Sequence, residues 1–88
     1  MRKANVKNAT YIVKVKSNKG ENRIDTIEII NTKTGEDLLP KKAGLASFND
    51  LKDLKESLNW CLNCWPEKMS IEWVNTKTAS YGTVYLVA

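Results

Sequence analysis

The chain has 88 residues, of which 42% are hydrophobic and 27% charged, with a net charge of +4 and no histidine. This length fits one domain, and the composition is that of a globular chain rather than a disordered or fibrous one. The lack of histidine excludes Ser-His and Cys-His nucleophile systems, and no apolar run approaches the roughly 18 residues that a membrane helix needs.

The basic side chains are concentrated at the start of the chain. Residues 1–20 contain six lysines and arginines and no acid, whereas the rest contains eight basic and ten acidic residues. No apolar segment follows the basic start, so we predict no signal peptide and expect a cytoplasmic location. We expect one domain over residues 1–88, with residues 1–8 as a basic N-terminal arm that could be flexible. Such an arm attracts phosphates or an acidic protein; the alternative is a solvated, lysine-rich segment that serves solubility.

Two strands are predicted next, at residues 10–16 and 24–30. Both are rich in β-branched residues that alternate with polar ones, and a polar, glycine-containing turn separates them. We expect them to pair as a hairpin. The face that would be buried carries Val13, Val15, Ile27 and Ile29.

A long connection leads to one predicted helix. Residues 37–46 form a segment longer than a usual connection, and ordered loops of this kind are often functional. Ser47 is a suitable N-cap, and Pro66 ends the helix near Cys64. An apolar stripe at three- and four-residue steps is expected to face the core and comprises Phe48, Leu51, Leu54, Leu58, Cys61, Leu62 and Trp65.

Two further strands complete the predicted fold, at residues 69–74 and 83–87. Met69, Ile71 and Trp73 alternate onto one face, which we expect to be buried. The predicted fold class is therefore α+β: an antiparallel four-stranded sheet with one helix on one face, in the order β-β-α-β-β.

Cys61-Leu62-Asn63-Cys64 matches the Cys-x-x-Cys pattern of redox sites. In such sites the reactive thiol lies at a helix N-terminus, where the dipole favours the thiolate, whereas these cysteines fall in the last predicted turn. We interpret Cys61 as a small core residue, with a redox role and metal-mediated dimerisation as alternatives. Two thiolates are too few for a structural zinc site, so we predict no metal, no cofactor and no catalytic residues.

Two surfaces are candidates for binding. A single helix covers one face of the sheet, so the other is expected to be open. That open face would carry Ile12, Lys14, Lys16, Thr26, Ile30, Val74 and Tyr85. The second candidate is Trp60, which lies at the edge of the helical stripe near Trp65; a core-edge position and an interface position are equally consistent with this pattern.

The first functional hypothesis is a non-enzymatic module that binds a protein or a nucleoprotein complex. Its predicted contact residues are Ile12, Lys14, Lys16, Lys41, Lys42, Trp60 and Trp65. The alternative is a nucleic-acid-binding domain that uses Arg2, Lys3, Lys7, Lys14, Lys16 and Lys19. The open face could also form a homodimer; an enzyme and a membrane protein are not expected.

In size, lack of histidine and predicted element order, the chain resembles the small inhibitor and accessory proteins carried by phages and mobile elements, anti-CRISPR proteins among them. The resemblance rests on these general features over the whole chain and on no sequence motif. It implies an inhibitor or accessory factor of a nucleoprotein machine. Many such proteins are acidic DNA mimics, so this basic chain would have to act in another way.

Overall fold

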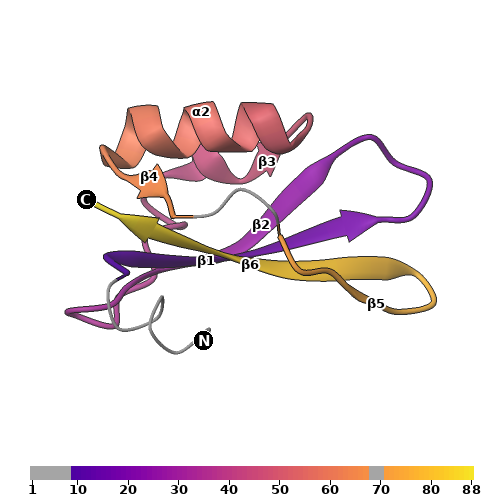
Figure 1. The fold of residues 1–88 in the computed structure, drawn as a ribbon, viewed down its shortest axis with the longest axis horizontal. Coiled ribbons are helices and arrows are strands. Elements are labelled where there is room, and N and C mark those ends of the chain that lie inside the picture. The colour runs from indigo at the N-terminus through magenta and orange to yellow at the C-terminus, as the bar shows by residue number, and fades with distance from the viewer. Residues whose placement is uncertain (1–8, 68–70) are drawn as a thin grey trace.

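A computed structural model describes residues 9–67 and 71–88. It shows one twisted antiparallel sheet with a single α-helix packed on one side (Figure 1). In chain order the elements are β1 (Tyr11–Asn18), β2 (Ile24–Asn31), the 3₁₀ helix η1 (Ala43–Leu45), β3 (Ser47–Phe48), α2 (Leu51–Leu62), β4 (Trp65–Pro66), β5 (Val74–Asn75) and β6 (Ala79–Val87). The sheet order is β3-β2-β1-β6-β4, and β5 also pairs with β6.

The predicted four-stranded sheet is therefore wrong, although an α+β fold remains. The sheet has six strands, in the order β-β-β-α-β-β-β. The two additional strands are β3 and β4, which have two residues each, as does β5, the remainder of the strand predicted at residues 69–74. Two residues cannot show the alternation from which a strand is predicted. These short strands form only because the long strands β2 and β6 offer backbone groups along their edges.

The core lies between α2 and the sheet. Leu54 and Leu58 of the helix are fully buried, as the predicted stripe requires. They belong to one hydrophobic cluster with residues of the three long strands, namely Val13, Val15, Ile29, Val84 and Leu86. Burial of each such side chain contributes roughly 1.5–3 kcal/mol before the entropy of ordering is subtracted.

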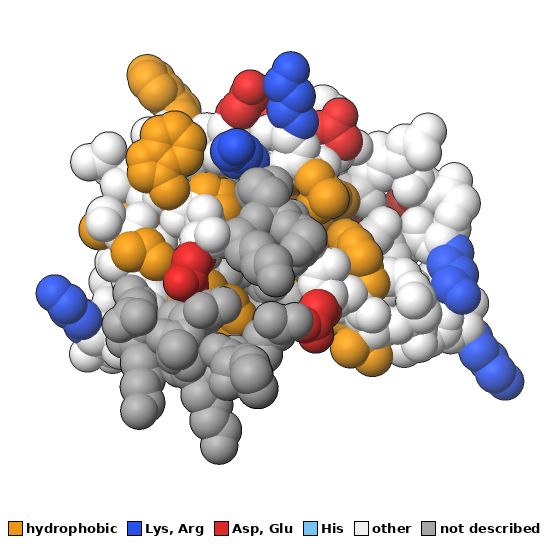
Figure 2. Space-filling model, viewed as in Figure 1, with side chains coloured by type: hydrophobic (Ala, Val, Ile, Leu, Met, Phe, Trp, Pro, Cys, Tyr) orange, Lys and Arg blue, Asp and Glu red, His pale blue; other side chains and the backbone are white. Residues whose placement is uncertain are grey.

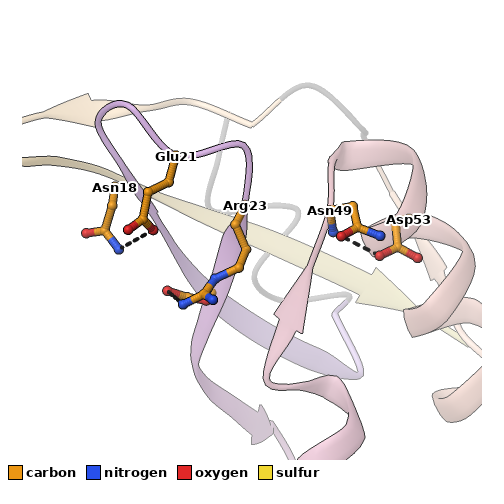
Figure 3. Close-up of polar contacts among 6 residues, drawn as sticks. Asn18, Glu21, Arg23, Asn49 and Asp53 are labelled. Carbon is orange, nitrogen blue, oxygen red and sulfur yellow. Dashed lines mark hydrogen bonds and ion pairs between the residues drawn. The ribbon is translucent and has the colours of Figure 1, made fainter.

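The helix begins later than predicted. Its N-cap is Asp50 rather than Ser47, and the Asp50 carboxylate accepts a hydrogen bond of 2.8 Å from the Asp53 backbone N–H. The Asp53 carboxylate in turn accepts one of 2.9 Å from the backbone N–H of Asn49 (Figure 3). Because this reciprocal cap starts the helix at Asp50, three residues after the predicted N-cap, Ser47 lies in β3 instead. The helix ends at Leu62, and Asn63 follows in the left-handed conformation.

A β-bulge changes which residues of β2 face the core. Lys14 pairs with Glu28 but Val15 pairs with Thr26, so Ile27 has no partner across the ladder. The extra residue reverses the alternation of side chains along the strand. Ile27, predicted to be buried, is 44% exposed, and Thr26, predicted for the open face, is 8% exposed.

The last strand is longer than predicted and contains a glycine at its centre. Gly82 of β6 lies opposite Val15 of β1 on the core side of the sheet. A Cβ atom at this position would lie 2.1 Å from Cγ2 of Ile71, so only glycine lets the segment before β5 pass this close to β6. Ile71 is 8% exposed and fills the space above Gly82.

The strand predicted at residues 69–74 is reduced to the two residues of β5. Ile71 and Trp73 nevertheless belong to the core, Trp73 as a partly buried side chain packed against it. Met69 lies outside the described residues. Within the segments that the structure describes, no helix is long and apolar enough to cross a membrane.

Candidate functional site

Two exposed tryptophans lie at the C-terminal end of the helix. Trp60 is 85% exposed and Trp65 is 58% exposed. Trp60 is two residues from both Leu58 and Leu62, which places it about 200° around the helix from the buried stripe. Figure 2 shows hydrophobic side chains gathered over this end of α2 and over β4. We call Trp60, Cys61 and Trp65 the tryptophan surface.

Two predictions for this region are wrong. Cys61, expected in the core, is exposed, while Cys64 is buried. Trp65, expected to continue the helical stripe, belongs to β4 and pairs with Val87 of β6. For Trp65 the reason is the reversal at Asn63, whose left-handed conformation ends the helix before that residue can follow its periodicity, whereas Cys61 still lies in the last turn of α2.

The cysteine pair has no arrangement that suggests redox or metal chemistry. Both thiols are free, and burial raises the pKa of Cys64, which disfavours the reactive thiolate. Among residues 9–67 and 71–88, no group of three His, Cys, Asp or Glu side chains could hold a metal ion.

The second candidate is the sheet face turned away from α2, which we call the outer face. Its central row is set by the pairing of β1 with β6. Ile12 lies opposite Tyr85, Lys14 opposite Thr83, and Lys16 opposite Tyr81. Side chains directly opposite each other point to the same side of a sheet. The outer face therefore brings two lysines and two tyrosines together.

A shallow hollow of about 170 Å³ lies on the outer face. It crosses the sheet from the bulge to β5, and its apolar side chains include Ile27, Val74 and Tyr81, all of them exposed. Lys14, Thr83 and Glu72 add polar groups to its lining. Val15 and Gly82 complete its lining.

The loop at residues 37–46 is held against the sheet rather than projecting from it. The Asp37 carboxylate accepts hydrogen bonds from the backbone N–H groups of Ile29 and Leu39, at 3.1 and 3.0 Å. The predicted contact residues Lys41 and Lys42 are both exposed. The Lys41 ammonium donates a 2.8 Å hydrogen bond to Glu36, and this contact raises the pKa of Lys41.

The predicted nucleic-acid residues are placed only in part. Arg2, Lys3 and Lys7 lie outside the described residues. Lys19 is exposed in the β1–β2 turn, and its backbone N–H donates to the Thr78 carbonyl at 3.1 Å, so this turn lies beside the β5–β6 turn. Figure 2 shows basic side chains standing out at that end of the molecule.

The residues predicted to contact a protein partner thus fall into three groups. Ile12, Lys14 and Lys16 share the outer face, Trp60 and Trp65 lie at the helix end, and Lys41 and Lys42 lie on the loop.

The predicted open face did not include Ile27, Tyr81 or Thr83, which the structure places on the outer face. The alternation of Tyr81, Thr83 and Tyr85 would have indicated a longer last strand. No signal in the sequence announces the bulge that exposes Ile27.

Comparison with known proteins adds no functional information: no family model, no curated protein and no solved structure matches this chain.

Proposed function

We propose that this protein is a non-enzymatic protein-binding module whose main contact surface is the tryptophan surface. The observation that carries the proposal is the exposure of Trp60, an indole on the outward side of a regular helix. A tryptophan there gains nothing for the core, and its apolar surface costs free energy in water. Tryptophan is among the residues that most often dominate binding at protein interfaces.

The geometry around Trp60 suits a rigid contact. The helix is fixed by the buried Leu54 and Leu58, and Trp65 is held in β4 by its pairing with Val87. Residues on packed elements lose little freedom on binding, because their backbone is already ordered. Each of the two exposed indoles, Trp60 on α2 and Trp65 on β4, is therefore preorganised for contact.

Given the small size and basic charge of the chain, the binding module acts, on this proposal, as an inhibitor or accessory factor of a nucleoprotein machine in the cytoplasm. On this proposal the partner is a protein surface with a groove for the Trp60 indole.

The experiment uses Cys61, which is exposed within the tryptophan surface, whereas Cys64 is buried. A thiol-reactive photo-crosslinker on Cys61 should join the partner in extract of the source cells, and mass spectrometry would identify it. The partner is then purified for a binding titration. Because a buried interface anchor contributes 2 kcal/mol or more, Trp60→Ala should weaken binding by about thirtyfold.

Tyr81→Ala is the matched control, since it removes an exposed aromatic from the outer face. It should leave affinity for the purified partner within about twofold. Circular dichroism and thermal unfolding would check that both variants fold. Wild-type affinity in both Trp60→Ala and Trp65→Ala would refute the proposal.

A further inference from the structure

The outer face combines features that the protein-binding proposal does not use. Lys14 and Lys16 stand on β1, and Tyr81 and Tyr85 stand on the adjacent strand β6. Tyr81 lies directly opposite Lys16, and Tyr85 is four positions further along the strand, about 13 Å away in an extended chain. Aromatic rings beside cationic side chains on a sheet are the means by which single-stranded nucleic acids are bound without sequence preference.

The distribution of charge along the chain agrees with this arrangement. The described residues contain ten basic and ten acidic side chains, so the net charge comes from Arg2, Lys3, Lys7 and Lys68. Residues 1–20 contain no acid at all. Within this stretch, β1 lies in the middle of the sheet, between β2 and β6.

The hollow beside Tyr81 supplies a place for a base. Its apolar side chains Ile27 and Val74 flank Tyr81, and Lys14 lines the same hollow. A base stacked there on the ring would leave its phosphate within reach of the lysines. The bulge contributes directly, because without it Ile27 would point to the core.

We propose that the outer face of β1 and β6 binds single-stranded nucleic acid, with Tyr81 as the stacking platform and Lys14 and Lys16 as phosphate contacts. This site is separate from the tryptophan surface and does not depend on the function proposed for it.

Three acids lie on or near this face and oppose an anionic ligand: Asp25, which is opposite Lys16, Glu28, which is opposite Lys14, and Glu72. The Lys14 ammonium lies 3.6 Å from the Glu28 carboxylate, and both side chains are partly exposed to water. Exposed ion pairs of this kind are weak, so Lys14 can exchange Glu28 for a phosphate. Glu72 lines the hollow as well. Neutralising Glu28 should therefore strengthen binding rather than weaken it.

The test is fluorescence anisotropy of the full chain with fluorescein-labelled oligo(dT) and oligo(U) of about twelve nucleotides, over a salt series. Loss of a stacking contact in Tyr81→Ala should weaken binding by about tenfold, whereas Tyr81→Phe keeps the ring and should bind like wild type. Replacing Lys14 and Lys16 by alanine should lower the slope of log affinity against log salt by about 0.7 for each lysine. Glu28→Gln should bind about two- to threefold more tightly.

The matched control is the pair Lys52→Ala and Lys55→Ala, which removes the same charge from exposed positions of α2. For this control variant, the slope of log affinity against log salt should equal that of wild type. The proposal is overturned by no binding at low salt, by equal affinity for duplex DNA, or by equal losses in the two double variants. Loss of binding only when Arg2, Lys3 and Lys7 are neutralised would also overturn it. Circular dichroism of each variant excludes unfolding as the cause.

Discussion

Replacing Gly82 by alanine tests how the sheet and the segment before β5 are packed. Gly82 occupies the centre of β6, where a residue with a Cβ atom would ordinarily be preferred. The added Cβ would lie 2.1 Å from Cγ2 of Ile71, but 3.4 Å from the Glu72 carbonyl oxygen and 3.5 Å from Cε3 of Trp73. Only the first contact is forbidden, so the cost depends on Ile71 alone.

The magnitude follows from the burial of Ile71. To reach an ordinary contact of 3.4 Å, its methyl group must move by about 1.3 Å. Ile71 is 8% exposed and packed in the core, so this movement costs about 1–3 kcal/mol, as overpacking usually does. Alanine recovers about 0.4–1 kcal/mol by restricting the unfolded chain. The midpoints of these ranges leave a net loss of about 1.3 kcal/mol in the free energy of unfolding, or roughly 5–10 °C in Tm.

Urea and thermal unfolding, followed by circular dichroism, measure this loss. Gly44→Ala is the control, because nothing lies within 4 Å of a Cβ there, and it should raise stability by about 0.4–1 kcal/mol. In an Ile71→Ala background the clashing methyl is absent, so Gly82→Ala should cost almost nothing. Equal costs of Gly82→Ala in the two backgrounds would refute the reasoning.

Three further outcomes are expected. Thr26→Val should raise stability by about 1 kcal/mol in urea unfolding, because the buried Thr26 hydroxyl has no hydrogen-bond partner and its desolvation is uncompensated; a loss of stability would contradict this. Asp50→Ala should lower stability by about 1 kcal/mol, since it removes the cap on the Asp53 N–H, and Asp50→Asn should restore most of it in the same assay. A thiol reagent should modify Cys61 well before Cys64, as followed by mass spectrometry, because Cys64 is buried and burial raises its pKa. Cys64 should react only at higher pH or on unfolding. Equal reaction rates of the two thiols in the native protein would argue against the burial of Cys64.

The periodicity of hydrophobic residues was sufficient to predict the elements that are long enough to show it. The alternation in β1 and β2 and the helical spacing of Leu54 and Leu58 predicted two strands and a helix that the structure contains. The α+β class and a helix on one face followed from them. The open face was also expected, and the placement of Ile12, Lys14 and Lys16 on it follows from simple alternation.

Only the tertiary structure decided the features that depend on a partner strand. The two-residue strands exist because β2 and β6 offer them an edge, and the bulge at Ile27 is a property of the pairing of β2 with β1 rather than of β2 itself. The exposure of Trp65 depends on the reversal at Asn63, which takes the chain out of the helix and into β4. Periodicity describes one segment at a time, whereas register and chain reversal are set by contacts between segments far apart in the chain, and the composition of both proposed surfaces depends on those contacts.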